Sequence, residues 1–498
     1  MRKLKSLSVI LLSGVMTSCM VGPNFHSPQA PATHRYTSTS MPKKTASTSG
    51  LRQGGQAQYF VDGKDIPGEW WKLFRSPQLD ALVRQGLANS PNLAAAEASL
   101  RVAQEALNAQ IGSTLFPQAN LQVTGTRNHL SLASVAGGSG SALYNLYNVS
   151  VPVTYTFDLF GGLRRQIESM SDQVLYQQFQ LEAAWLTLTS NIVTTVITIS
   201  SLEDQIKATR ELVKIQEDQL RIVKGQFNLG GVSMSNVLSQ QAQLAQTQAS
   251  LSPLEQNRDK AVHALAVLVG SLPSDLTPPK IDLDKIHLPT QLPVSLPSSL
   301  VRQRPDIRAS EALLASASAQ IGVATANMLP QISLTGAFGY TSTSTGTFFT
   351  PANKVWNYGG QLLQPVFNGG ALLAQKRQAV DAYQQAAAQY RQVVLTAFQN
   401  VADTLRALQH DAQALQSLRN AELASRRAMQ LASEQFKLGG VNYVVLLTAN
   451  QQYRLAFISR IQAQATRYND TAALFQALGG GWWNQAACSS CNKKASVS

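Results

Sequence analysis

The hydrophobic residues between Gly162 and Phe227 recur at intervals of three, four or seven positions. Residues with this spacing lie along one edge of a helix and form the seam of a coiled coil. At about 1.5 Å per residue, a helix of roughly 65 residues is on the order of 100 Å long. The pattern therefore predicts a rod longer than any compact domain needs. The apolar line in its second half is Ile199, Leu202, Ile206, Val213, Leu220, Val223 and Phe227.

The same line returns later in the chain, where position 408 corresponds to 199, an offset of 209. The stretch 186–200 is rich in β-branched residues, which favour a strand. Its counterpart, 395–409, has a helical composition, so we predict helix for both. The recurring positions are Leu408, Leu415, Glu422, Met429 and Phe436, of which Glu422 alone is polar.

Further motifs recur at similar offsets, which predicts one architecture of two similar halves. The first repeat is expected at 69–270, with a long helix at 162–227 and a return helix at 234–269. A proline-rich linker, 271–297, follows. The second repeat is expected at 298–480, with a long helix at 370–436 and a return helix at 442–478.

Four stretches alternate between apolar and polar residues with a period of two, which is typical of β-strands. They lie at about 120–130, 148–158, 331–343 and 354–367. Strands of about ten residues with one apolar and one polar face fit an outer-membrane barrel, whose outside contacts lipid and whose inside contacts water.

Four strands are too few to close a barrel, and unpaired strand edges in lipid cost several kcal/mol per polar group. A trimer supplies twelve strands around a water-filled lumen, whereas the eight strands of a dimer would be filled by side chains. We therefore predict a mainly α fold with a transmembrane β portion. A 12-stranded β-barrel, built from four strands per protomer of a trimer, continues into a long α-helical coiled-coil barrel.

The N-terminus has the features of a bacterial export signal at 1–18, with a basic start and an apolar run. Residues 16–18 precede Cys19 and resemble a lipobox, in which the cysteine becomes lipidated; a plain signal peptide cut nearby is the alternative. Met20 is not an aspartate, so we expect sorting to the outer membrane. Residues 19–68 are rich in Ser, Thr, Pro and Gly and predict an extended tether, and 481–498 predict an irregular tail.

The remaining composition offers little chemistry. If Cys19 is lipidated, Cys488 and Cys491 remain and could form a small disulfide in an oxidising compartment. The six histidines are scattered without ligand spacing, and no catalytic set or phosphate loop is present, so we expect no metal, no cofactor and no enzyme activity. The formal net charge is +13, but no basic stripe or recognition motif argues for a nucleic-acid partner.

Several stretches together resemble one known family. They are CMVGPNF at 19–25, WWKLFRSPQLDALV at 70–83, RPDIRASEALLASASAQIGVATANMLPQISLTG at 304–336 and FKLGGVNYVVLL at 436–447. They are similar to the outer membrane factors, the TolC-like channels, and specifically to the lipoprotein branch found in tripartite efflux pumps. The resemblance implies a homotrimer in the outer-membrane lipid that meets a periplasmic adaptor protein and an inner-membrane transporter.

The resemblance also implies roles for individual residues. The two helical tips would dock on the adaptor, and residues beside the second tip would close the periplasmic aperture. Many relatives carry aspartates at the positions of Asn236 and Thr448, so closure here would depend on an apolar ring of Val444; ordinary packing between helices is the alternative for this valine. The tips are Asn228, Leu229, Gly230 and Gly231, and Lys437, Leu438, Gly439 and Gly440; the aperture residues are Phe436, Val444 and Thr448.

Three functions remain open on the sequence. The first is an exit duct for small toxic compounds, as in multidrug efflux. The second uses the same tube to export a protein or a siderophore-like product. The third is a structural coiled coil of the periplasm without a pore.

Overall fold

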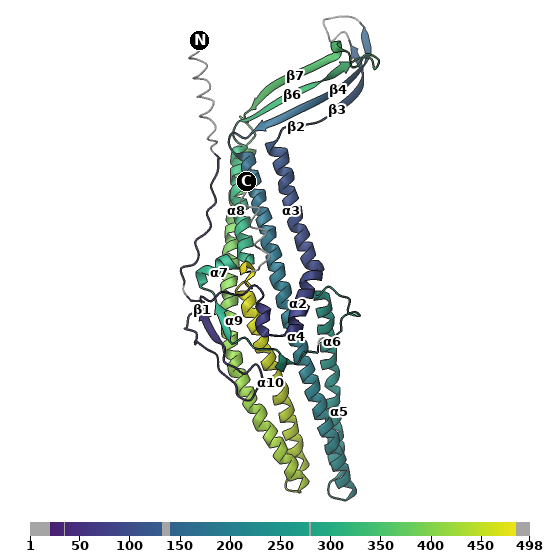
Figure 1. The fold of residues 1–498 in the computed structure, drawn as a ribbon, viewed down its shortest axis with the longest axis vertical. Helices are drawn as coiled ribbons and strands as arrows, with labels where there is room; N and C mark the ends of the chain where they lie inside the picture. Colours follow the sequence, from purple (N-terminus) through teal and green to yellow (C-terminus); the bar gives the residue numbers. More distant parts are fainter. Residues whose placement is uncertain (1–19, 34, 132–139, 278–279, 485–498) are drawn as a thin grey trace. The chain divides into compact units, whose positions relative to one another are not determined.

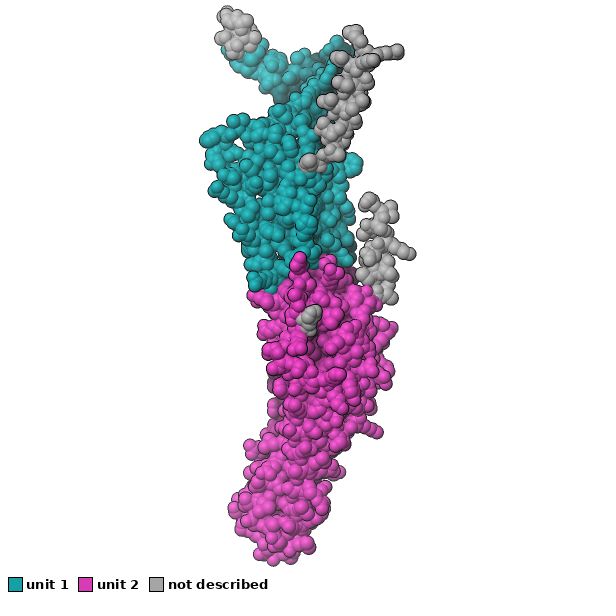
Figure 2. All heavy atoms as spheres, turned by 90° about the vertical axis from the view of Figure 1, so that its left-hand side faces the viewer, with its two compact units in different colours: residues 1–28, 99–178, 309–391 teal, residues 29–98, 179–308, 392–498 magenta. Residues whose placement is uncertain are grey.

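The computed structural model describes residues 20–33, 35–131, 140–277 and 280–484. The expected signal peptide, Cys19, Cys488 and Cys491 therefore lie outside the described residues. The chain divides into two compact units (Figure 2). Unit 1 comprises residues 1–28, 99–178 and 309–391, and unit 2 comprises 29–98, 179–308 and 392–498.

Two helices of 67 residues each, α4 (Gly162–Asn228) and α9 (Ala371–Lys437), contribute to both units (Figure 1). Helix α4 begins at a glycine turn, where both carboxylate oxygens of Asp158 accept hydrogen bonds from the backbone amides of Leu163 and Arg164, at 3.1 and 2.9 Å. This contact satisfies amides that lack a partner within the helix. The β-branched stretch 186–200 is helical because its apolar side chains are buried; these include Ile192, Val193, Val196, Ile197 and Ile199.

Among the described helices, α4 alone contains an 18-residue window that is long and apolar enough to cross a membrane. Of that window, 56% is buried inside the protein. A buried core helix has the same property, so the apolar character of α4 is accounted for by packing.

Unit 1 contains an antiparallel sheet, whose strands curl side by side in Figure 1. Strand β4 lies between β6 on one side and the short β2 followed by β3 on the other, and β6 pairs with β7. The outer edges of β3 and β7 have no strand partner among the described residues. The strands are β2 (Gln118–Ala119), β3 (Gln122–Ser131), β4 (Ser141–Phe157), β6 (Gln331–Ser342) and β7 (Lys354–Leu363).

Two strand boundaries differ from the prediction. Strand β4 begins at Ser141 rather than at about 148, because its first residues pair with β3 as far as Ser131. Strand β7 ends at Leu363 rather than at 367. Pro365 lies just beyond this end and has no amide hydrogen to donate to a partner strand.

The register gives the sheet two chemically different faces, because residues directly opposite each other on paired strands share a face. One face is apolar and carries the rows Val151–Phe338–Trp356 and Phe157–Ile332–Leu362. The other face is polar and small, with rows such as Thr154–Thr335–Gly359 and Thr156–Ser333–Gln361. On the apolar face the exposed fractions are 40% for Val151, 48% for Phe338 and 65% for Trp356.

Unit 2 is built around an aromatic core. The short 3-10 helix η2 (Trp70–Phe74) buries Trp70 and Phe74, and Trp70 stacks on Phe475 with ring centroids 5.3 Å apart. Helix α2 follows, with Ser76 capping its first turn by accepting from the Leu79 amide at 3.4 Å. The helices that contribute to this core, besides α4 and α9, include α2 (Pro77–Asn89), α6 (Leu251–Leu268), α7 (Pro297–Gln303) and α10 (Tyr443–Ala477), whereas Val237 of α5 (Met234–Ala249) belongs to a separate apolar cluster.

The helices that lead into the sheet are α3 (Pro91–Leu115) and α8 (Pro305–Ala326). The predicted single return helix at 234–269 is wrong, since the structure has two helices, α5 and α6, that meet at Ser250. Pro253 lacks the amide hydrogen that would bond to the carbonyl of Ala249, so a continuous helix is disfavoured there.

The predicted extended tether is also wrong for its second part. Gln58 and Ile66 are fully buried, and β1 (Tyr59–Asp62) pairs in parallel with β5 (Gln291–Val294) inside the predicted linker. The linker in turn buries Ile281, Leu283, Ile286, Leu288 and Leu292. The tether and the linker, which show no periodicity in the sequence, thus form ordered structure by pairing and packing with each other. The tail packs on the end of the tether, because the Trp483 indole donates to the Asp65 carboxylate at 3.0 Å and the Asn484 amide donates to the carbonyl of Ile66 at 2.7 Å.

Glycine substitutions test how tightly this unit is packed. Gly270 has φ +71°, and a Cβ there would lie 2.2 Å from the carbonyl oxygen of Asn89; Gly63 has φ +73° with open space around it. Both alanine variants carry the backbone strain of about 1 kcal/mol, but only Gly270→Ala adds a clash of about 2 kcal/mol. We expect Gly270→Ala to lower the melting temperature of the purified protein several times more than Gly63→Ala. Equal shifts would contradict this packing.

Candidate functional site

The two helical tips have the same backbone geometry. Gly230 and Gly439 have φ values of +74° and +76°, which favour glycine. At the first tip the Gly231 amide donates to the carbonyl of Gln226 at 2.8 Å; at the second the Gly440 amide donates to that of Gln435, also at 2.8 Å. This is the Schellman closure of a helix.

Each closure leaves one leucine in solvent. Leu229 is 89% exposed and Leu438 is 88% exposed. Asn228 and Lys437 are the last residues of α4 and α9. The tips therefore present equivalent apolar side chains on equivalent turns.

The predicted aperture residues fall into two environments at the start of α10. Val444 is 62% exposed, and Thr448 is exposed one turn later, where its hydroxyl donates to the carbonyl of Val444 at 2.9 Å. Phe436 is instead 6% exposed and packs edge to face on Tyr443, with ring centroids 5.9 Å apart. The structure thus brings Val444 and Thr448 together on an exposed face and places Phe436 behind them, in the packing between helices.

Phe436 belongs to a small apolar cluster beside the tips, which draws on both halves of the chain. Its members are Val223, Val237, Met429, Ala432, Phe436, Tyr443, Leu446 and Ala449. From Tyr443 to Tyr453 helix α10 carries no charged residue. The exposed face at Val444 and Thr448 is therefore uncharged. It presents methyl groups, and the Thr448 hydroxyl already donates a hydrogen bond within the helix.

Neutral hydrogen bonds connect α10 to the helices of the first half; we call this set the amide ladder. The Tyr443 hydroxyl bonds to Oε1 of Gln240, whose amide nitrogen donates to the carbonyl of Gln216 at 3.1 Å. Burial raises the pKa of Tyr443, so the hydroxyl stays protonated. The other members are Asn450 with Gln219 at 3.2 Å, Gln451 with Gln243 at 2.8 Å and Gln462 with Gln205 at 3.2 Å.

Sequence reasoning missed the amide ladder. Gln216 and Gln219, like Gln240 and Gln243, are three residues apart and occupy buried positions in otherwise coiled-coil helices. That spacing of buried amides was the available signal.

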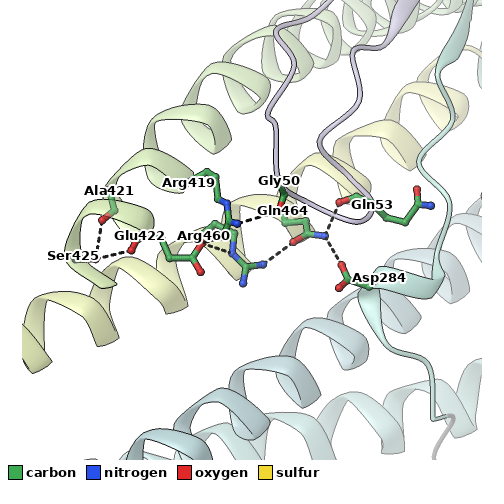
Figure 3. A network of polar contacts seen from close by, with 9 residues as sticks. All are labelled: Gly50, Gln53, Asp284, Arg419, Ala421, Glu422, Ser425, Arg460 and Gln464. Atoms are coloured by element: carbon green, nitrogen blue, oxygen red, sulfur yellow. Dashed lines mark hydrogen bonds and ion pairs between the residues drawn. The ribbon is translucent and has the colours of Figure 1, made fainter. Parts of the chain in front are cut away.

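Glu422, the one polar member of the second seam, is the centre of a charge network (Figure 3). The residue is 3% exposed, and Oε2 accepts from Arg419 at 2.6 Å and from Arg460 of α10 at 3.2 Å. The second guanidinium nitrogen of Arg419 donates to the carbonyl of Gly50 at 3.0 Å. The carboxylate therefore holds α9 to α10 and, through Arg419, to the N-terminal segment.

The network continues along α10 toward its C-terminus. Arg460 donates to the side chain of Gln464 at 2.8 Å, and Gln464 donates to the carbonyl of Gln53 at 3.1 Å (Figure 3). Farther along, the fully buried Arg467 donates to the carbonyls of Gly54 and Gln56, both at 2.7 Å. These contacts fasten residues 50–56 to α9 and α10.

Arg467 is bonded by neutral oxygens. It also donates to Thr45 at 3.0 Å and to Gln58 at 3.2 Å, and among the described residues no carboxylate forms an ion pair with it. Burial lowers the pKa of Arg467 to about 10, which leaves it charged at neutral pH. A buried charge with a hydrogen bond at every nitrogen is a fixed structural contact rather than a reactive group.

The described residues contain no group of three or more His, Cys, Asp or Glu side chains that could hold a metal ion. Cys19 and the pair Cys488 and Cys491 lie outside the described residues. The candidate functional features of the described residues are therefore surfaces. They are the two faces of the sheet, the two exposed tips and the uncharged face at Val444.

A family model described as "Outer membrane efflux protein" matches residues 82–271 and again residues 296–480. The chain belongs to this family. It is an outer-membrane efflux channel protein, which confirms the resemblance and the location inferred from the sequence. Proteins of this family are channels rather than enzymes.

Individual relatives match along most of their length. The pyoverdine export outer membrane protein OpmQ of Pseudomonas aeruginosa is 28% identical over 87% of this chain and 92% of its own. The probable efflux pump outer membrane protein TtgC of Pseudomonas putida is 26% identical over 99% of this chain and 98% of its own. The solved outer-membrane channel OprN is 28% identical, with a TM-score of 0.84 over 93% of this chain and all of its own.

Replacing Glu422 tests the charge network. Glu422→Gln keeps the size of the side chain but leaves Arg419 and Arg460 without their shared anion in a largely buried place. We expect a loss of about 3 kcal/mol in stability, visible as a lower melting temperature. Glu434→Gln, on the exposed face of the same helix, is the matched control and should change the melting temperature little. A Glu422→Gln protein as stable as that control would show that the network carries no stability.

Proposed function

We propose that this chain forms the outer-membrane duct of a tripartite efflux system and exports small toxic compounds across the periplasm and the outer membrane. The observation that carries the proposal is the sheet of unit 1, which has an apolar face and an opposite polar face, and whose outer edges at β3 and β7 have no strand partner among the described residues. Apolar outside and polar inside is the pattern of a membrane barrel.

The proposed oligomer is a homotrimer. Strands β3, β4, β6 and β7 give four long strands per chain, and lipid tolerates no unpaired edges. Three copies would supply twelve strands, with β3 of one copy beside β7 of the next, around a lumen wide enough for water.

An internal duplication is part of the proposal. The order helix, two long strands, 67-residue helix and return segment occurs twice, as α3 to α6 and as α8 to α10; the two-residue β2 has no counterpart in the described residues of the second half. The family model also matches the chain twice. We propose that the helices of both halves line one continuous α-helical barrel beneath the strands.

We propose that the two tips dock on a periplasmic adaptor protein, which connects the duct to an inner-membrane transporter. The exposed Leu229 and Leu438 support this, because apolar side chains that lie in solvent gain free energy when a partner removes them from water. Cys19 is proposed as the lipidated first residue of the mature chain, with Cys488 and Cys491 as a disulfide pair.

The proposed aperture is a ring of Val444 from three copies, with Thr448 behind it. Its support is the exposure of Val444 at the start of α10 and the lack of charge on this part of the helix. Such a ring closes by excluding water rather than by binding ions, so closure should depend little on pH.

Export of a siderophore-like product is the second candidate, favoured by the similarity to OpmQ, which is named for pyoverdine export. A deletion strain separates the two. Greater sensitivity to drugs, dyes and bile salts with normal siderophore secretion supports efflux, and the reverse supports export. Purified protein that passes no current in planar bilayers would exclude both.

Substitution of Val444 tests the aperture. Val444→Ser replaces three methyl-bearing side chains of the ring with polar ones and should raise both single-channel conductance in bilayers and the entry of large antibiotics into the periplasm. Val267→Ser, on an exposed position of α6 far along the chain from the tips, is the control. Conductance equal to that of the control would argue against a constriction at Val444.

Substitution of Tyr443 tests whether the amide ladder holds the aperture shut. Tyr443→Phe leaves the buried Oε1 of Gln240 without its donor, at a cost of about 1–3 kcal/mol. We expect α10 to loosen and the channel to spend more time open in bilayer recordings. Tyr453→Phe removes a hydroxyl that makes no hydrogen bond within the described part of the chain, and should leave the open time unchanged. Identical open times for both variants would contradict a role of the amide ladder in closing the aperture.

A further inference from the structure

The first described residues of the chain lie against the start of α4 and against α8. The Val21 amide donates to the carbonyl of Phe160 at 3.0 Å. Gly22 has φ +93°, and a Cβ there would come within 2.5 Å of the Cα of Gly322 in α8. The backbone of the N-terminal segment therefore touches the backbone of α8 directly, at a distance that a larger side chain would prevent.

Arg165 binds this segment from the first turn of α4. It is one of the largest fully buried side chains, 2% exposed. Its Nε donates to the carbonyl of Val21 at 3.2 Å, and one terminal nitrogen donates to Oδ1 of Asn24 at 2.6 Å. The other terminal nitrogen pairs with Glu168 at 2.7 Å. Two of the three acceptors of this buried guanidinium thus belong to residues 21–24.

The corresponding position in the second half shows that the helix start itself does not need an arginine. Counted from the glycine pairs at 161–162 and 369–370, Arg165 corresponds to Leu373, which is 45% exposed. Burying a guanidinium is costly unless its donors are occupied. The first half therefore carries a buried charge, and the N-terminal segment supplies two of its three hydrogen-bond acceptors.

Met20, the first described residue of this segment, also has a defined contact. Gly161, between β4 and α4, has φ +75°, and a Cβ there would lie 2.7 Å from the side chain and 2.9 Å from the Cα of Met20. Met20 is thus packed on the turn where the strand becomes a helix.

We propose that residues 20–24 occupy a dedicated docking site, with Arg165 as its central positioning residue, and that this site fixes where the acyl chains of Cys19 enter the membrane. The attachment point is then the residue before Met20, and Met20 packs on the junction of β4 and α4. The second part of this inference rests on the proposed lipidation of Cys19; the docking site does not.

Hydrogen–deuterium exchange of the full-length mature protein in lipid nanodiscs tests the site at the Val21 amide. Asn24→Ala removes one acceptor, and Arg165→Gln removes the guanidinium. We expect exchange at Val21 to become at least about tenfold faster in both variants, since each loses a hydrogen bond to a charged group. Asn24→Asp keeps an acceptor for Arg165 and should retain the protection. Because Asn24 lies outside α4, its variants also separate loss of docking from misfolding of the helix.

Two results would overturn the docking site: an unprotected Val21 in the unmodified protein, or equal protection in Asn24→Ala and Asn24→Asp. A form exported with an ordinary signal peptide and without Cys19 supplies the second comparison. It should keep Val21 protected; loss of protection would mean that the lipid, not Arg165, orders the segment. The mass of the N-terminal peptide independently reports lipidation, so an unacylated Cys19 would refute the membrane-entry part and leave the exchange results standing.

Discussion

Backbone groups at the edge of a sheet cannot remain unpaired in lipid, and this constraint governs the whole arrangement. The sheet of unit 1 ends at β3 on one side and at β7 on the other, and its exposed apolar rows would contact hydrocarbon. Water is absent there, so each free N–H and C=O must find a strand. The proposed trimer satisfies this constraint by joining β3 and β7 of neighbouring copies, and the proposed duct is the consequence of that closure.

The helices are held together by two kinds of polar contact, buried charged contacts and neutral amide contacts. Arg467 and the Glu422 network bind residues 50–56 through charged donors, most of them with little exposure to solvent. Nearer the tips, α10 meets α4 and α5 through neutral amides, which cost less to separate than buried charges. Separating α10 from its neighbours near Val444 should therefore cost less free energy than separating it at Glu422, which suits the proposed aperture at Val444.

The parts of the fold that follow from local periodicity could be predicted from the sequence. Helices α4 and α9 and strands β3 and β6 belong here, because each displays its period over many residues. The packing of 45–66 on α10 could not be predicted, since the buried Gln58 donates to Pro289 and Thr471, which lie more than 200 residues away. Pro253 was a readable signal for the break between α5 and α6. The burial of Phe436 depends on helices from both halves and has no local signature.

The same distinction holds for the site. Glycines 230 and 439 mark the tips by their own conformational requirements, so the tips could be located from the sequence. The polar partners of Glu422 and Tyr443 are set by tertiary contacts and could not.

Cysteine cross-linking between the two open edges tests the proposed closure most directly. In a background without the native cysteines, Thr124→Cys on β3 is combined with cysteines scanned along β7 from Asn357, all on the polar face. The account predicts a covalent ladder that ends at three chains once the register matches. Monomers alone at every pair, or a ladder that continues beyond three, would contradict it.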